Sequence, residues 1–348
     1  MNPPSKKSIT LKQPDDWHIH LRDGEALPRT VNDAARQFER VLVMPNLTPP
    51  IIDVPAALAY RQRILDALED GLSLDPKMAL YLTDTTTAAT VEQAAENPHC
   101  VAFKWYPAGA TTNSDSGVTD TKKIYPALES MQKHGVVLCI HGEVTDSHID
   151  IFDREAVFID RTLNNIVRDF PTLKIVFEHI TTKDAVDFVV DSPNTVAATI
   201  TAHHLRYNRN AMLAGGIRPH YYCLPILKRS EHQQALITAA TSGNPKFFLG
   251  TDSAPHLQGD KESSCGCAGS YTAFSALEFY AEVFAEQNAL DQFEGFSSQF
   301  GAEFYGLSPH QSTVDLMHKS LAIPEYLDMS GSKLIPLDAG CTLNWQLV

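Results

Sequence analysis

Short apolar segments recur along the chain, separated by longer stretches in which apolar residues return every three or four positions. The short segments are typical of buried strands, and the longer period is typical of amphipathic helices. The pattern predicts eight strands, at residues 16–21, 41–46, 78–83, 101–106, 136–142, 173–180, 195–204 and 246–253. Helices are expected between them, most clearly at 54–70, 122–134, 153–169 and 227–242.

Strand–helix alternation of this kind predicts a parallel sheet, and eight repeats favour closure into a TIM-type (β/α)8 barrel. A doubly wound open sheet is the alternative, but no Gly-x-Gly-x-x-Gly motif follows the first strand. Further helices near 270–288 and 295–306 are expected to form a C-terminal helical extension packed on the barrel. No linker-like stretch precedes this extension, so residues 1–348 are predicted to form a single domain.

Composition narrows the classes of function. With 348 residues, of which 43% are hydrophobic, the chain can bury a large core. Its formal net charge is −14 and it has no run of Lys or Arg, which argues against nucleic acid and anionic membranes as partners. The six cysteines are sparse and irregularly placed, so we expect free thiols in a reducing cytoplasm. Neither a secretory segment nor a membrane span is expected.

Several predicted strands carry a polar residue at or near their C-terminal end. Lys104, His141 and His179 are spaced by about one strand–helix unit, so they fall on successive strands. A (β/α)8 barrel places its active site at this end of its strands, and polar groups there are hard to explain by packing. We therefore expect convergence of the whole set: His18, His20, Asn46, Lys104, His141, His179, His203, His204 and Asp252.

His18 and His20 lie two residues apart on a predicted strand, so both imidazoles share one face, and Arg22 continues that face. Alone, the pair is equally compatible with surface histidines on an edge strand. Together with His141, His179 and Asp252, it forms a ligand set suited to zinc or a similar ion, beside a guanidinium that can bind an anion.

Lys104 lies amid the apolar residues of its strand, where a lysine would ordinarily pair or extend to solvent. Alternatively, a desolvated amine can react with carbon dioxide, and the resulting carbamate could bridge two metal ions. The positive charge of two divalent ions would exceed the summed negative charge of a carbamate, Asp252 and a bridging hydroxide. The remaining positive charge would suit an anionic substrate.

Two loops carry further hypotheses. Asp252, in the segment 250–256, could bind a metal and move a proton to a leaving nitrogen, or it could form an ordinary Asx-turn. The small, polar segment 107–117 could be a lid over the substrate or a plain surface loop. His203 and His204 are expected to be structural or peripheral, because the ligand set is complete without them.

The chain resembles the amidohydrolase superfamily and, within it, the bacterial dihydroorotases of the pyrimidine pathway. The resemblance runs nearly end to end. It is carried by Pro14-Asp-Asp-Trp-His-Ile-His-Leu-Arg-Asp-Gly24, Val43-Met-Pro-Asn-Leu47, Ala110-Thr-Thr-Asn-Ser114, His141-Gly-Glu143, residues 177–184, residues 224–229, Gly250-Thr-Asp-Ser-Ala-Pro-His256 and residues 261–269.

The resemblance implies two zinc ions, with His18, His20 and Asp252 at the more buried one and His141 and His179 at the other. It implies that Lys104 is a carboxylated bridge and that Asp252 is the general acid and base beside a metal-activated hydroxide. Substrate contacts are implied at His20, Arg22, Asn46, Thr111, Thr112, His141, Leu224, His256 and Ala268. A cytoplasmic homodimer is also implied.

The expected reaction is the reversible closure of N-carbamoyl-L-aspartate to L-dihydroorotate with loss of water. One alternative is a hydantoinase-like hydrolase of another cyclic amide, which would not need the carboxylate clamp of Arg22, Asn46 and His256. The other is an inactive barrel that serves as an assembly partner, which should have lost ligands, whereas all six ligand positions are present.

Overall fold

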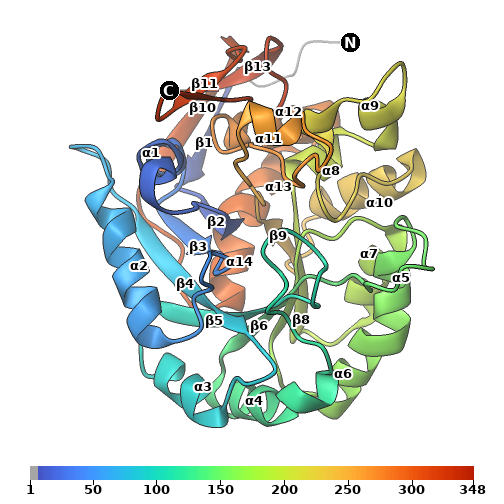
Figure 1. Ribbon diagram of the computed structural model, residues 1–348. Coiled ribbons are helices and arrows are strands. Elements are labelled where there is room, and N and C mark those ends of the chain that lie inside the picture. The colour runs from blue at the N-terminus through green and yellow to red at the C-terminus, as the bar shows by residue number, and fades with distance from the viewer. Residues whose placement is uncertain (1–6) are drawn as a thin grey trace.

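Eight parallel strands form the central sheet of the computed structural model, which describes residues 7–348 (Figure 1). In spatial order they are β2 (Asp15–Ile19), β3 (Arg40–Val43), β4 (Asp75–Leu82), β5 (Cys100–Trp105), β6 (Val137–Ile140), β7 (Ile175–Phe177), β8 (Val196–Ile200) and β9 (Phe247–Leu249). A parallel bridge between Ile19 and Ser253 joins the first strand to the chain just after the last. The predicted (β/α)8 barrel is confirmed.

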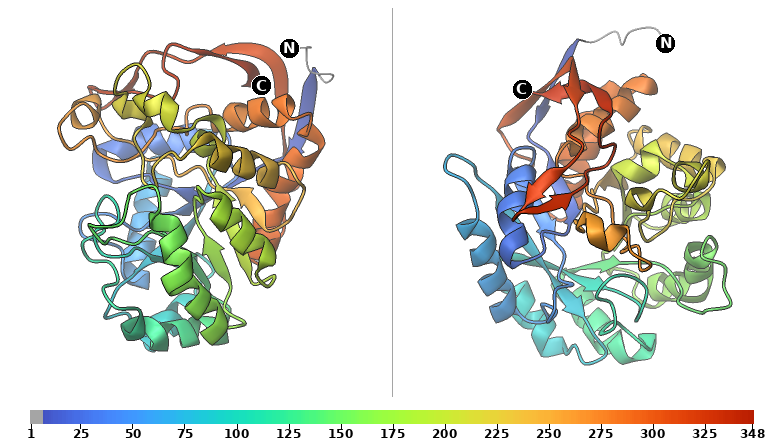
Figure 2. Two further views of the ribbon diagram at one scale, coloured as in Figure 1. Left: turned by 90° about the vertical axis from the view of Figure 1, so that its right-hand side faces the viewer. Right: turned by 45° about the horizontal axis from the view of Figure 1, so that its top comes forward.

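Helices follow the strands and cover the outside of the sheet (Figures 1 and 2). The α-helices are α1 (Leu27–Ala35), α2 (Val54–Asp66), α3 (Ala88–Ala95), α4 (Thr121–His134), α5 (Arg154–Phe158), α6 (Asn164–Asp169), α7 (Lys183–Asp191), α8 (Ala202–Arg206), α9 (Arg209–Leu213), α10 (Ser230–Ala240), α11 (Gln258–Lys261), α12 (Ala276–Glu286), α13 (Leu290–Glu294) and α14 (Phe300–Phe304). Two 3₁₀ turns, η1 (Gly24–Ala26) and η3 (Pro219–Tyr221), and two π-helical segments, η2 (Ile159–Leu163) and η4 (Gly295–Gln299), complete the helical elements.

Local sequence sets the ends of several helices. The Asp53 carboxylate accepts a hydrogen bond of 2.9 Å from the amide of Ala56 and so caps the start of α2. Gly135 ends α4 in the left-handed region, with φ 73°, as the His134-Gly135 pair predicts. The predicted helices at 54–70, 122–134, 153–169 and 227–242 are all present, the third with a π-helical segment in its middle.

The C-terminal extension differs from the prediction in its last part. Helices are present near 270–288 and 295–306 as expected, but the residues beyond them form strands: β10 (Thr313–Ala322), β11 (Leu327–Met329), β12 (Ser332–Leu334) and β13 (Thr342–Leu347). β10 pairs antiparallel with both β13 and the N-terminal strand β1 (Ser8–Lys12), and these segments lie side by side in Figure 2. The extension is therefore only partly helical. The strand β10 pairs with β1, which is about 300 residues away in the sequence. A local sequence pattern cannot predict a pairing of such long separation.

The barrel interior contains two kinds of layer. Inward side chains of the strands, with Met44 just after β3 and Ala302 of α14, form one apolar cluster, here called the apolar layer: Trp17, Leu42, Met44, Ala79, Ala102, Val137, Cys139, Val176, Ala197, Phe248 and Ala302. Trp17 stacks on Tyr305, with ring centroids 4.2 Å apart, so the segment after α14 covers this layer. Two residues further along three strands lie Lys104, His141 and Glu178, here called the polar layer, all buried.

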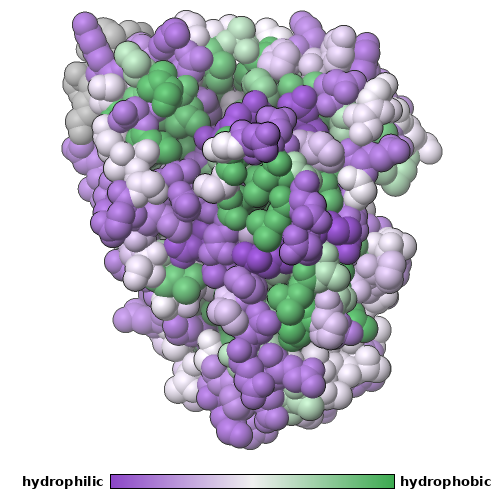
Figure 3. Space-filling model, turned by 90° about the vertical axis from the view of Figure 1, so that its left-hand side faces the viewer, coloured by the Kyte–Doolittle hydropathy of each residue, from purple (hydrophilic) through white to green (hydrophobic). Residues whose placement is uncertain are grey.

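The outer face of the barrel is mostly polar, as Figure 3 shows from the side of α2, with separate apolar patches. Exposed apolar side chains near α2 include Ile52 and Leu58. Within residues 7–348, every helix is too short or too polar to span a bilayer. The six cysteines are free, in agreement with the prediction.

Candidate active site

A cavity opens at the carboxyl end of the barrel strands, where the predicted site residues meet. Of those residues, Lys104, His203, His204 and His256 do not line the cavity; the others do. The lining residues are His18, His20, Arg22, Asn46, Tyr106, Thr111, Thr112, His141, His179, Leu224, Asp252, Ala254, Ala268 and Gly269. The spacing therefore correctly predicts convergence: the lining residues come from six strand ends, from the 107–117 loop and from the segment before α10.

Asp252 follows the last strand and contacts the two histidines at the end of the first strand, His18 and His20. One of its carboxylate oxygens lies 3.3 Å from His18 Nε2 and 3.1 Å from His20 Nε2, and all three side chains are buried. Burial alone would raise the pKa of Asp252, but the charge of His18 and hydrogen bonds from both imidazoles hold that pKa well below its usual value. The carboxylate is therefore anionic at neutral pH.

The other histidines extend this cluster. The ring centroid of His18 lies 5.0 Å from that of His179, which in turn lies 4.8 Å from that of His141. His179 is buried and its Nδ1 has no hydrogen-bond partner within the described residues. A nitrogen lone pair without a partner is available to a ligand at this point.

Lys104 forms a buried ion pair with Glu178, and its ammonium also lies 4.8 Å from the centroid of the Tyr106 ring. The other oxygen of Glu178 lies 3.0 Å from His18 Nδ1. Burial would raise the pKa of Glu178, but the charges of His18 and Lys104 lower it to about 2. Glu178 thus places a negative charge beside the side of His18 that faces away from Asp252.

Three site residues adopt backbone conformations that are unusual for residues other than glycine. Arg22, His179 and Asp252 have φ values of 59°, 42° and 47°. Each lies two or three residues beyond its strand and lines the cavity. For His179, which follows the inward-facing Glu178, the left-handed turn directs inward a side chain that strand alternation would turn outward. Such strain costs about 1–3 kcal/mol per residue and is typical of functional sites.

Gly250 makes room for His18. A Cβ atom at this position would lie 2.8 Å from the Thr199 side chain and 3.1 Å from His18 Cβ. Because Gly250 has no side chain, the chain after β9 can approach His18 closely. This approach places the Asp252 carboxylate beside the His18 imidazole.

The opposite side of the cavity is suited to an anion. His256 Nε2 lies 3.1 Å from both Arg22 Nη2 and the carbonyl oxygen of Ala268. Burial lowers the pKa of His256 to about 3, so its imidazole is neutral at pH 7. The Arg22 guanidinium is partly buried and lacks a carboxylate partner within the described residues, which leaves its positive charge directed at the cavity.

The 107–117 segment covers the cavity. Asn46 donates a hydrogen bond of 3.1 Å to the Thr112 carbonyl, and the Asn113 amide returns one of 3.1 Å to the Asn46 carbonyl. The Thr112 hydroxyl lies 3.5 Å from the carbonyl oxygen of Ala268 on the far side. This loop is closed over the site through Asn46, which also contacts His20 Nδ1 at 2.8 Å.

Sequence reasoning assigned no role to Glu178, Glu143 or Tyr106. Glu143 Oε2 lies 3.0 Å from His141 Nε2 and orients that imidazole through a hydrogen bond, whereas Glu178 places its charge beside His18. Both glutamates lie beside a predicted ligand, in His141-Gly-Glu143 and Glu178-His179. Because metal-binding histidines usually have a carboxylate on the second ring nitrogen, a buried acid beside such a histidine is the signal that could have identified them.

The donor set fits divalent metal ions. Two groups of ligand atoms, His18–His20–Asp252 and His18–Glu178–His179, lie within 4.8 Å of one another in each group. Imidazole nitrogen and carboxylate oxygen are typical zinc donors. The carboxylates of Asp252 and Glu178 lie on both sides of the His18 imidazole, and a bound divalent ion would supply the balancing positive charge that protonated His18 otherwise provides.

Comparison with known proteins agrees with this chemistry. The model of the Amidohydrolase family matches residues 16–315. The chain belongs to the amidohydrolase family. It is 61% identical over 340 residues to the dihydroorotase of Teredinibacter turnerae, covering 98% of each chain.

Solved structures of this family give the same result. The dihydroorotase of Saccharomyces cerevisiae in complex with 5-fluoroorotic acid superposes with a TM-score of 0.90 at 34% identity, covering 99% of each chain. The Campylobacter jejuni dihydroorotase superposes with a TM-score of 0.90 at 34% identity, covering 100% of this chain and 98% of the other. The structural match therefore includes the C-terminal strands as well as the barrel.

Proposed function

We propose that the chain is a dihydroorotase, which interconverts N-carbamoyl-L-aspartate and L-dihydroorotate in pyrimidine biosynthesis. The observation that carries this proposal is one cavity in which a histidine–carboxylate cluster faces the Arg22 guanidinium, which has no carboxylate partner within the described residues. The cluster suits hydrolysis of an amide, and the guanidinium suits the carboxylate that dihydroorotate carries. The full-length relatives support the same activity.

The residues that would hold metal are His18, His20, Asp252, His141 and His179, with Lys104 as a carboxylated bridge between two zinc ions. When bound, such ions lower the pKa of a water molecule and polarise a carbonyl. Lys104 suits this role because it is buried within the cluster, on the strand between those of Tyr81 and His141. In the unmodified state Glu178 neutralises its charge.

Substrate orientation is assigned to the opposite side of the cavity. Arg22 would bind the carboxylate through its guanidinium, with Asn46 and His256 beside it, while Ala268 and Leu224 would offer backbone groups to the ring. Thr111 and Thr112 would contact the substrate from the covering loop. His20 and His141 would meet it from the ligand side, as both line the cavity.

Asp252 is proposed to move the proton. In the hydrolytic direction, water adds to the ring amide carbonyl, Asp252 accepts the proton of the attacking oxygen, and the C–N bond breaks as Asp252 protonates the leaving nitrogen. In the synthetic direction the same steps run backwards and water is lost. The low pKa of Asp252 keeps it deprotonated at neutral pH, which is the form that a proton acceptor must have.

Dihydroorotate hydrolysis by Asp252→Ala tests this assignment. We expect turnover to fall by about 100-fold to 10,000-fold, the usual contribution of general acid–base catalysis. Metal content should be measured in the same preparation, and Asp252→Asn provides a variant of matched size. Near wild-type turnover would contradict the role given to Asp252.

A hydantoinase-like activity is the alternative, and Arg22 distinguishes the two. Arg22→Gln should lower kcat/KM for dihydroorotate by about 10-fold to 100-fold, because a hydrogen bond to a charged group contributes about 1.5–3 kcal/mol. Hydrolysis of an uncharged cyclic amide by the same variant is the control. If the uncharged amide is the better substrate of the wild-type chain, the alternative is correct.

We also propose that the chain is a cytoplasmic homodimer that acts on this small-molecule substrate. The support is the resemblance to dihydroorotases. Sedimentation equilibrium across a range of concentrations would give the mass of the assembly, and a monomer at all concentrations would contradict the proposal.

A further inference from the structure

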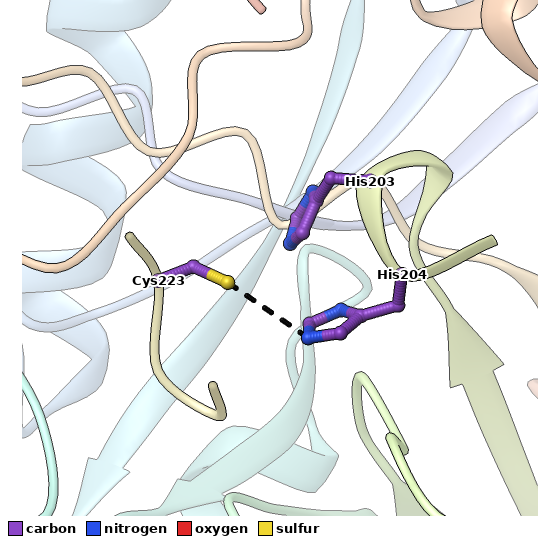
Figure 4. Close-up of side chains that lie close together, drawn as sticks. All are labelled: His203, His204 and Cys223. Carbon is purple, nitrogen blue, oxygen red and sulfur yellow. Dashed lines mark hydrogen bonds between the residues drawn. The ribbon is translucent and has the colours of Figure 1, made fainter. Parts of the chain in front are cut away.

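A second group of metal-binding side chains lies outside the catalytic cluster. His203 and His204, adjacent in α8, and Cys223, in the segment that follows η3, place one ligand atom each within 4.8 Å of one another. All three residues are at most 2% exposed. Figure 4 shows the imidazoles of His203 and His204 turned toward the Cys223 thiol from one side.

His203 is the unusual member. Both of its ring nitrogens are buried without a hydrogen-bond partner within the described residues. A buried polar group in this state costs about 1–3 kcal/mol, so an imidazole with two unpaired nitrogens calls for a ligand. Figure 4 shows one of these nitrogens directed at the gap between Cys223 and His204.

The distances around His204 resemble those between ligands of one metal ion. Cys223 Sγ lies 3.8 Å from His204 Nε2, and tetrahedral zinc with ordinary Zn–N and Zn–S bonds requires a separation of ~3.6 Å. The carbonyl oxygen of Pro225 lies 2.9 Å from the same nitrogen and 3.3 Å from the same sulfur. This oxygen is placed to act as a fourth ligand.

His204 can offer its Nε2 lone pair without losing its other contact. Its Nδ1 lies 2.7 Å from the Thr201 hydroxyl, which can either donate to that nitrogen or accept from it. The tautomer with hydrogen on Nδ1 therefore keeps the Thr201 bond and frees Nε2. In the other tautomer Nε2 donates to Pro225, so the protein holds the imidazole in place in both states.

We propose that His203, His204 and Cys223, with the Pro225 carbonyl, form a separate binding site for one thiophilic divalent ion of the zinc class. Burial raises the pKa of Cys223 to about 12 and lowers that of His203 to about 4. The imidazole is thus already in its ligand form, and the thiol must release its proton to the solvent when the ion binds. This proposal stands independently of the proposed function.

Occupation would connect two segments around the cavity. α8 follows β8 directly, and Leu224, which lines the cavity, lies between two of the proposed ligands. An ion here would fix the backbone of Leu224 relative to the barrel without touching the substrate. The site would therefore affect order in this segment more than chemistry.

Cobalt(II) provides a direct test, because none of the proposed catalytic ligands contains sulfur. Thiolate bound to Co(II) gives a charge-transfer band in the near ultraviolet, so such a band reports a cysteine ligand. We expect the cobalt-loaded full chain to show this band. Cys223→Ser should abolish it and reduce bound cobalt by one equivalent per chain, and His203→Gln should weaken cobalt affinity at this site by at least about 10-fold.

Two cysteines nearer the surface provide the matched control. Cys265 and Cys267 have sulfur atoms 3.8 Å apart and could bind cobalt themselves. The double variant Cys265→Ser with Cys267→Ser should retain the band. Absence of the band in the wild-type chain at saturating cobalt, or its loss in the double variant and persistence in Cys223→Ser, would overturn the proposal. If Cys223→Ser does not fold, unchanged cobalt affinity in His203→Gln would overturn it equally.

Discussion

The two ends of the barrel interior are built from the same strands and have opposite character. On β5 the inward face changes from Ala102 to Lys104, and on β6 the change is from Cys139 to His141. The apolar layer packs and needs no partners, whereas every member of the polar layer has a charged partner. Lys104 pairs with Glu178 from another strand, and His141 contacts Glu143 two residues further along its own segment. Along each of these strands, the residue of the apolar layer, which stabilises the fold, thus lies two positions before the residue of the polar layer, which belongs to the candidate site.

The largest effect should follow from breaking the polar layer at Lys104. Lys104→Met leaves Glu178 with His18 as its remaining cation, so we expect turnover to fall at least 100-fold, about 2.7 kcal/mol in activation free energy. We also expect a loss of about 3 kcal/mol in the free energy of unfolding. Turnover, bound metal and denaturant unfolding should be measured together.

The double variant Lys104→Met with Glu178→Met sharpens this result. Replacement of a whole buried ion pair by apolar residues is often neutral or stabilising, so unfolding stability should recover while activity does not. An active double variant would show that the polar layer is not needed for the reaction.

The apolar end should respond in the reverse way. A Cβ atom at Gly301, in α14, would overlap with the Trp17 indole, so Gly301→Ala should cost about 1–3 kcal/mol of unfolding free energy. Turnover per folded molecule should stay unchanged. Gly259→Ala is the matched control, because nothing lies within 4 Å of its Cβ position. A stability loss equal to that of the control would contradict the packing argument.

The smallest effect concerns a buried acid outside the barrel. Glu278, in α12, accepts a hydrogen bond of 3.1 Å from the Leu347 amide, and burial raises its pKa from 4.5 to about 6. The folded state then binds the proton more tightly than the unfolded state. The resulting stabilisation is complete below pH 4.5 and disappears as pH rises through 6.

Glu278→Gln removes this dependence while it keeps the acceptor for Leu347. The variant should therefore be more stable than the wild type at pH 7 by up to about 2 kcal/mol, and the difference should vanish near pH 4. Thermal unfolding at both pH values measures this, with the exposed Glu129→Gln as control. An equal gain at both pH values would refute the assignment to Glu278.

Sequence predicted the barrel well because each strand–helix unit carries its own pattern. It also predicted convergence of the site, since residues such as Lys104 and Asp252 lie at equivalent points of successive units. It did not predict the role of Glu178, which depends on His18 and Lys104 from two other strands. The strands β10–β13 were missed because they lie outside the repeating strand–helix units: β10 pairs with β13 and with β1 at the other end of the chain, and β11 pairs with β12. In addition, β10 is mostly exposed, so its pattern of buried positions is weak.

The closure of the barrel sets the order in which activity can appear during folding. Asp252 and His18 are 234 positions apart, yet the Asp252 amide donates to the His18 carbonyl at 2.8 Å. Contacts of such long sequence separation form late, because the entropy of the intervening loop must be lost first. A folding intermediate in which β9 has not yet paired would position His18 and His20 without the Asp252 carboxylate. Catalysis would therefore report the last event of folding, and no partly assembled barrel would hydrolyse its substrate.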